Sequence, residues 1–278
     1  MRTLLQPLLL TCLLPIVGLA EEAKEIRILH TPSGIRFGIL GNGSAGPLPT
    51  LFLFGGRIED TLPPNGVHYI TNIARHDILC VSLDIPCHGQ LQKPNEPQGM
   101  AGWCHRLARG DNWIPNYVAK LSTVLDYLVD QKMTDPGHIG ACGISRGGFV
   151  ALHWAAADRR VRCVAGLSPV THLPALREFQ GMDDDPLTQT LSVHHLADKL
   201  VGRSLWIQVG NNDRRVSTAH CVSFIQHVVD ATRKVRAVDG DHGKPVPAEL
   251  HITPVPGHTA DAVAHNQAAA WVREQLAK

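Results

Sequence analysis

The sequence lacks the features that would point to nucleic acid, a metal ion or a membrane. Its net charge is only +1, and no basic run carries interleaved aromatic residues, so we exclude nucleic acid as a partner. It contains neither a Cys-x-x-Cys pair nor a His-Glu-x-x-His helix, and we predict no metal site. The adjacent His194 and His195 are interpreted as a solvated helix face in preference to metal ligands. After residue 20, no apolar run is long enough to span a membrane.

The first 20 residues differ in composition from the rest of the chain. Arg2 precedes an apolar stretch over residues 4–19, and Gly18-Leu-Ala20 supplies the small residues of a cleavage site. This pattern predicts a secretory signal peptide. We therefore expect an exported protein, periplasmic or extracellular, with residues 21–278 as a single domain. A lipoprotein is the alternative, but Thr11 is a poor residue before a lipidated Cys12.

Six cysteines follow the predicted signal peptide, and an exported chain permits disulfide bonds. Cys80, Cys142 and Cys163 lie in strand-like segments, where a buried thiol is the ordinary state. Cys87 and Cys104 lie in loop-like sequence and are the pair best suited to a disulfide, with two free thiols as the equal alternative.

Apolar strand-like segments alternate with helix-like segments over most of the chain. Segments at residues 25–30 and 35–40 flank a Pro-Ser-Gly turn and predict an antiparallel hairpin. The later apolar segments are typical of strands buried on both faces of a parallel sheet. We predict an α/β fold with a mostly parallel eight-stranded sheet and helices on both faces. The other strands are expected at 49–54, 78–83, 138–142, 161–167, 204–209 and 250–255, helices at 65–75, 117–129, 217–230 and 259–277, and a loop-rich stretch at 90–112.

Residues 169–202 interrupt this alternation with a stretch rich in Pro, His and Asp. Such an insertion after the sixth strand would lie over the ligand-binding edge of the sheet, and we expect a small lid. Leu173, Leu176, Phe179 and Met182 are candidate walls of an acyl pocket, although their spacing fits plain packing equally well.

One segment carries the strongest chemical signal. A short apolar strand runs into Gly143-Ile-Ser145-Arg-Gly147, and an Ala-rich helix follows. A serine on such a turn presents its hydroxyl above the sheet edge, and the two glycines let the helix pass close behind it. A purely structural turn is the alternative, but the strand before and the helix after favour Ser145 as a nucleophile.

A serine needs a histidine base and a carboxylate to become a good nucleophile. Asp213 follows the strand at 204–209, and His258 follows the strand at 250–255. Because the chain order Ser, Asp, His is specific to one fold, we predict a triad of Ser145, Asp213 and His258. A capping or turn role is the alternative for Asp213. Competing residues are Asp183, Asp184 and Asp185 for the acid, and His242 and His251 for the base.

An oxyanion hole would need two backbone N–H donors near the serine. Arg146 begins the predicted helix, where N–H groups lack intrahelical acceptors, and should supply one. Gly56 or Arg57 should supply the second, from the loop after the strand at 49–54. Gly56, Asp84 and all three triad residues follow strand ends, where ligands bind in such sheets.

Together these motifs resemble the α/β-hydrolase superfamily, and they are nearest to secreted bacterial esterases of the dienelactone hydrolase and prolyl-oligopeptidase-like branches. The turn Asp84-Ile-Pro-Cys-His-Gly89 resembles the superfamily's Asp-x-Pro-Gly-His-Gly turn, whereas Phe54-Gly-Gly56 replaces its frequent His-Gly-Gly. The resemblance implies the hydrolase fold from about residue 25 to the end of the chain.

We therefore predict an exported serine hydrolase that cleaves small carboxylic esters through an acyl-enzyme and needs no cofactor. Its expected partner is a small-molecule ester with an uncharged acyl group. A serine peptidase or aminoacyl amidase with the same triad is the nearest alternative. A non-catalytic binding protein that kept the fold is the more distant one.

Overall fold

The structure is a computed structural model, and it describes residues 25–41, 46–63, 69–240 and 243–278. The predicted signal peptide lies outside the described residues, as does His242. Over these described ranges, none of the helices has the length and apolarity that a membrane span requires.

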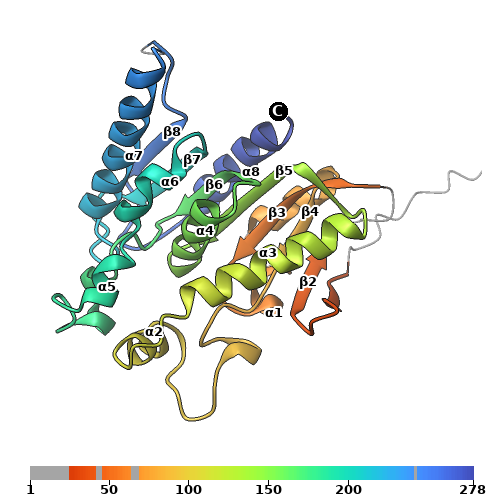
Figure 1. Cartoon of the computed structure of the whole chain (residues 1–278), viewed down its shortest axis with the longest axis horizontal. Helices are drawn as coiled ribbons and strands as arrows, with labels where there is room; N and C mark the ends of the chain where they lie inside the picture. Colours follow the sequence, from red (N-terminus) through yellow and green to blue (C-terminus); the bar gives the residue numbers. More distant parts are fainter. Residues whose placement is uncertain (1–24, 42–45, 64–68, 241–242) are drawn as a thin grey trace, which may run out of the picture.

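Eight strands form one sheet in the order β1-β2-β4-β3-β5-β6-β7-β8 (Figure 1). β1 is antiparallel to β2 and β2 to β4, whereas every other neighbouring pair is parallel. This confirms the predicted sheet with a hairpin at one edge. The strands are β1 Arg27–His30, β2 Arg36–Leu40, β3 Leu48–Phe54, β4 Leu79–Ser82, β5 Thr134–Ile144, β6 Val161–Leu167, β7 Ser204–Gly210 and β8 Ala248–Thr253. The helices outside the insertion are α1 Ile58–Thr61, η1 Tyr69–His76, η2 Gly89–Leu91, α2 Gly99–Leu107, α3 Ile114–Asp130, α4 Arg146–Ala157, α7 Thr218–Asp239 and α8 Ala262–Leu276, where η marks a 3-10 helix.

The central strands bury side chains on both faces of the sheet. Phe52 and Phe54 of β3 face one side, and Leu51 and Leu53 face the other, as the two-residue period of a strand requires. Helices α2, α3, α4 and α7 cover the first side, and α1, η1 and α8 cover the second (Figure 1). Trp154 of α4 contacts Phe52 with ring centroids 4.4 Å apart. The parallel strands are therefore held with their carboxyl ends at one common edge.

The expected loop over residues 90–112 is wrong for Gly99–Leu107, which form α2. Pro and Gly dominate the sequence before this segment, but Met100, Trp103 and Leu107 recur at helical spacing and are buried. Trp103 Nε1 donates to the Pro86 carbonyl at 2.8 Å. This hydrogen bond ties α2 to the loop after β4.

Cys87 and Cys104 are free thiols, so the disulfide between them is wrong. A Cβ built at Gly102 of α2 would lie 2.7 Å from the Cys87 sulfur. Gly102 and Cys104 are two residues apart and point to different sides of the helix. The Cys104 sulfur contacts Met182 Sδ at 3.3 Å instead, and burial raises the pKa of Cys87 to about 12. Cys80, Cys142 and Cys163 are buried, as predicted.

The insertion at residues 169–202 consists of short helices and turns. Leu173, Leu176 and Phe179 are at most 1% exposed and belong to the main core. This burial favours the packing interpretation of their spacing over the acyl-pocket interpretation. The helices are η3 Leu173–Ala175, η4 Arg177–Phe179, α5 Pro186–Thr190, η5 Val193–Leu196 and α6 Ala197–Leu200.

Candidate active site

Ser145 stands between β5 and α4 in a backbone conformation that few side chains adopt. Its φ is 53° and its ψ is −115°, and strain of this kind costs about 1–3 kcal/mol. Its N–H donates to the Leu167 carbonyl at 2.9 Å, and its own carbonyl accepts from the Val170 N–H at 3.0 Å. A strained turn fixed by the neighbouring backbone is the geometry of a nucleophile elbow.

The glycines on either side of Ser145 are required by close backbone contacts. A Cβ at Gly143 would lie 2.1 Å from the Gly147 carbonyl carbon, and one at Gly147 would lie 1.8 Å from the Phe54 carbonyl oxygen. Real Cβ atoms essentially never come within 3.0 Å of another atom in this way. The two glycines therefore let α4 begin directly against β3 and β5.

Asp213 and His258 meet beyond the ends of β7 and β8. Asp213 Oδ2 accepts from His258 Nδ1 at 2.8 Å, and Oδ1 accepts from the N–H groups of Arg215 at 2.8 Å and Val216 at 3.1 Å. Burial alone would raise the pKa of Asp213, but the hydrogen bonds from His258 and the backbone outweigh it and hold this pKa below its ordinary value. The carboxylate is therefore charged at neutral pH.

The His258 ring is oriented by the loops that follow β7 and β8. Gly257 has a φ of 55°, and its N–H donates to Asn212 Oδ1 at 3.0 Å. Since an ionised carboxylate only accepts, His258 Nδ1 is the donor in this contact, and in the neutral tautomer of the ring Nε2 carries the lone pair. Within the described residues, no hydrogen bond joins His258 to Ser145. Such contacts are often long before substrate binds, and the full triad stays a prediction.

The competing acids and base have other partners. Asp185 Oδ1 caps the N-terminus of α5 at 2.7 Å, while Asp183 and Asp184 are exposed. His251 lies on β8 and contacts Glu249 at 3.2 Å. Of the acids considered from the sequence, Asp213 is the one that reaches His258.

Among the backbone N–H groups near the elbow that have no acceptor in the described structure, two belong to the residues expected to form the oxyanion hole. They are those of Arg146, the first residue of α4, and Arg57, which precedes α1. The Gly56 N–H, in contrast, donates to Thr61 Oγ1 at 3.4 Å. Arg146 Nε donates to the Gly55 carbonyl at 3.1 Å and holds this loop beside the start of α4. Of the two residues expected for the second oxyanion donor, Arg57 therefore fits better.

His88 borders the same loop, and the sequence predicted no role for it. A Cβ at Gly56 would lie 3.3 Å from His88 Cδ2 and 3.5 Å from the Arg146 guanidinium. His88 Nδ1 donates to the Pro86 carbonyl at 3.0 Å. Burial, and then the charge of Arg146, lower the pKa of His88, while burial and Arg215 lower the pKa of Arg146. The available signal was the Asp84–Gly89 turn, which places His88 at the sheet edge.

The adjacent histidines of the insertion lie in η5, close to another histidine ring. The rings of His194 and His195 have centroids 3.9 Å apart and planes tilted by 45°. Burial, followed by the neighbouring histidines, lowers the pKa of His194 to about 4. Across the described part of the chain, no group of three or more His, Cys, Asp and Glu side chains is arranged to hold a metal ion.

Comparison with known proteins gives the family. Residues 102–278, which include the elbow and the histidine loop, match the prolyl oligopeptidase family. The chain belongs to this family. A search of curated proteins finds no match.

Solved structures share the fold at low sequence identity. Acetyl xylan esterase 1 from Thermoanaerobacterium sp. JW/SL YS485 superimposes with a TM-score of 0.65 and 17% identity, over 91% of this chain and 88% of that chain. A Thermus thermophilus protein superimposes with a TM-score of 0.67 and 16% identity, over 91% of this chain and 99% of that chain. Dipeptidyl peptidase 4 from Porphyromonas gingivalis gives 0.64 and 15%, over 91% of this chain but only 35% of that chain. This chain thus spans about a third of the length of that peptidase.

The family match and these neighbours confirm the predicted α/β-hydrolase superfamily and its fold. Esterases and peptidases both occur among the neighbours. Together they support an enzyme of the hydrolase class, and specifically a serine hydrolase.

Proposed function

We propose that the protein is an exported serine hydrolase that cleaves small carboxylic esters through an acyl-enzyme. The observation that carries the proposal is the 2.8 Å hydrogen bond between Asp213 and His258. It couples a charged carboxylate to a histidine at the sheet edge where the strained Ser145 also stands. Export is proposed from the predicted signal peptide alone.

In the proposed reaction, Ser145 Oγ attacks the ester carbonyl carbon while His258 Nε2 takes the hydroxyl proton. Asp213 holds the ring through Nδ1 and stabilises the imidazolium. His258 then gives its proton to the alcohol oxygen, the C–O bond breaks, and an acyl-enzyme remains. In the second half, His258 takes a proton from water, the hydroxide attacks the acyl carbon, and Ser145 leaves with the proton.

The developing oxyanion is bound in this proposal by the N–H groups of Arg146 and Arg57. Neither group has an acceptor among the described residues, so both are available to a substrate oxygen. Removal of one such donor typically lowers turnover by about 10²–10³. The half-buried Arg146 guanidinium places a positive charge beside the same loop.

The insertion supports a small acyl group. The side chains of Leu173, Leu176 and Phe179 are buried in the core. The insertion therefore offers little apolar surface to a long acyl chain. Each methylene that does become buried contributes only about 0.8 kcal/mol. The specificity constant for nitrophenyl esters should therefore be highest for acetate or butyrate. A maximum at octanoate or palmitate would contradict the small-ester assignment.

A peptidase with the same residues is the second candidate, and the prolyl oligopeptidase family match favours it. Ester and amide hydrolysis share the acyl-enzyme, so the triad geometry does not separate them. Measurement of kcat/KM on matched acyl esters and aminoacyl amides separates an esterase from a peptidase. Cleavage of the amides with no cleavage of simple acyl esters would favour the peptidase.

Replacement of the nucleophile tests the shared mechanism. Ser145→Ala should lose hydrolytic rate by up to a factor on the order of 10⁶, while circular dichroism shows a folded protein. An organophosphonate should label the wild-type protein on Ser145, as located by mass spectrometry. Unchanged activity in the variant would refute the assignment, and a folded wild-type protein that resists labelling would favour the non-catalytic alternative.

A further inference from the structure

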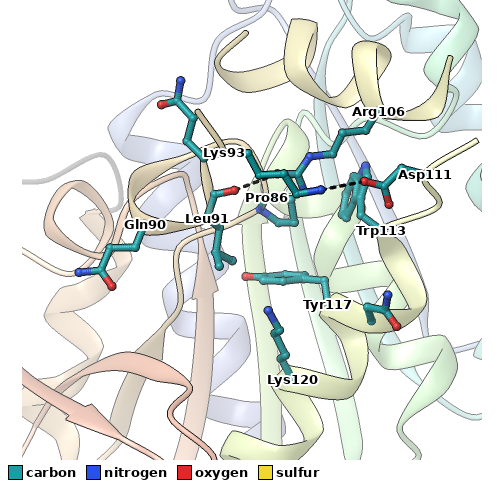
Figure 2. A pocket seen from close by; sticks show the side chains of 11 residues that line it. Pro86, Gln90, Leu91, Lys93, Arg106, Asp111, Trp113, Tyr117 and Lys120 are labelled. Carbon is teal, nitrogen blue, oxygen red and sulfur yellow. Dashed lines mark hydrogen bonds and ion pairs between the residues drawn. The ribbon is translucent and has the colours of Figure 1, made fainter. Parts of the chain in front are cut away.

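A cavity with a mixed polar and apolar lining lies away from the proposed catalytic residues. It is open to solvent and has a volume of about 280 Å³, and it lies between the loop after β4, the residues before α3 and α3 itself (Figure 2). A second cavity of about 240 Å³ reaches to the hairpin turn and shares Gln90, Leu91 and Lys120 with the first. Ser145, Asp213 and His258 line neither of them.

One face of α3 forms a wall of the larger cavity. Trp113, Asn116, Tyr117 and Lys120 line it, and their spacing of three, four and seven residues places them on one side of a helix. Pro86 and Leu91 face them from the loop after β4. Figure 2 shows the Tyr117 hydroxyl and the Lys120 side chain directed into the space beneath Leu91. The wall therefore combines aromatic surface with polar ends.

Two buried donors in this wall have no hydrogen-bond partner in the described structure. Tyr117 is 2% exposed and Trp113 is 4% exposed, yet neither the Tyr117 hydroxyl nor Trp113 Nε1 is paired. Buried polar groups are almost always paired in folded proteins. The neighbouring Trp103 follows that rule through its bond to Pro86. Of the two, the Tyr117 hydroxyl is directed into the cavity, so it is the donor that an acceptor from a ligand would satisfy.

Of the four charged side chains that line the larger cavity, three form ion pairs. Arg106 is paired with Glu96 at 2.7 Å, and Lys93 is paired with Asp111 at 3.2 Å. Lys120 forms no ion pair with any described residue. The ligand that complements this wall carries one negative charge, accepts hydrogen bonds from neutral donors, and has an apolar part to lie against Pro86 and Leu91.

We propose that this cavity binds a small organic carboxylate. One carboxylate oxygen accepts from the Tyr117 hydroxyl, and the carboxylate charge is balanced by Lys120. At about 280 Å³, the cavity falls just below the roughly 300–1,000 Å³ of pockets for drug-sized ligands, so the ligand is smaller than these. Inorganic phosphate fits poorly, because it has no apolar part and carries more than one charge.

The test is a calorimetric titration of the full chain with benzoate, its neutral isostere benzamide, hexanoate and phosphate. Benzoate and hexanoate should bind saturably. Benzamide should bind at least about tenfold more weakly than benzoate. Tyr117→Phe and Lys120→Gln should each weaken benzoate binding by roughly tenfold. Lys199→Gln, a change at an exposed lysine of α6, is the matched control and should leave binding unchanged.

Each variant also has a readout without ligand. Lys120 is exposed, so Lys120→Gln should not disturb folding. The Tyr117 hydroxyl is unpaired, so Tyr117→Phe should leave the melting temperature unchanged or raise it, and both variants should still hydrolyse nitrophenyl acetate. Absence of saturable binding by either carboxylate, equal binding of benzoate and benzamide, or unchanged binding in both variants would each overturn the proposal. Phosphate binding as tight as that of benzoate would do the same.

Discussion

Two buried aspartates occupy equivalent places in the fold and have different partners. Asp84 follows β4 and Asp213 follows β7, and they are 4% and 3% exposed. Asp84 accepts from the N–H groups of Ile58 at 2.9 Å and Gln90 at 2.8 Å, and from the Arg36 guanidinium at 3.4 Å. Every partner of Asp84 is therefore a donor that holds a turn or a strand in place.

Asp213 differs from Asp84 in its third partner. Two backbone N–H groups occupy Oδ1, as in a turn, but Oδ2 accepts from His258. Arg36 is a permanent cation that also pairs with Glu59, whereas His258 has a second nitrogen that can take a proton. Position after a strand places a carboxylate at the sheet edge, and the side chain bound to its second oxygen determines whether it can assist a reaction.

The largest expected difference between the two aspartates is catalytic. Asp213→Asn should lower kcat by roughly 10⁴, because the amide donates to His258 Nδ1 and favours the tautomer whose Nε2 is already protonated. The Asn carbonyl oxygen can still accept from Arg215 and Val216, so the loop should stay folded. Steady-state kinetics on nitrophenyl acetate measure the loss. A small effect here, with a large one from a change at Asp183, Asp184 or Asp185, would move the acid to the insertion.

Asp84→Asn should affect stability instead. Its carbonyl oxygen can still accept from Ile58 and keep Arg57 in place, but its amide group would meet two donors, Gln90 N–H and Arg36. Such a loss of a buried acceptor costs about 2 kcal/mol. Urea unfolding should show this decrease, while kcat changes by less than about tenfold. A fall in kcat as large as that of Asp213→Asn would show that Asp84 acts in the reaction.

Much of the fold could be predicted because the parallel strands are buried on both faces. Residues 51–54 of β3 are all buried, and such runs are continuous and apolar in sequence. Helix α2 was missed because Pro and Gly before it masked the spacing of Met100, Trp103 and Leu107. The hairpin was clear because apolar and polar residues alternate in the sequence on either side of a Pro-Ser-Gly turn, and β1 and β2 do pair there.

The part of the site that depends on the backbone geometry of a local sequence motif could be predicted. Gly143 and Gly147 are required by contacts within the elbow itself. The choice between Gly56 and Arg57 was not predictable, because it depends on the direction of the Thr61 hydroxyl. The unpaired donors of Trp113 and Tyr117 were also hidden, because their surroundings are set by a loop more than 20 residues earlier.

The smallest expected effect is on the free energy of unfolding at acid pH, and it tests the contribution of the charged Asp213 and its hydrogen bond to His258. The folded pKa of Asp213 is lowered, so the unfolded chain binds a proton more readily at this site, with an unfolded pKa of about 3.9. The stabilisation is thus fully present above about pH 4 and is lost as the pH falls through the lower folded pKa. Urea unfolding at a series of pH values should show the stability gap between wild type and Asp213→Asn constant near neutrality and shrinking in acid. Ser145→Ala leaves this carboxylate intact, so its curve should run parallel to that of the wild type. A gap that persists unchanged at the lowest pH would mean that Asp213 stabilises the fold by packing, without help from its charge.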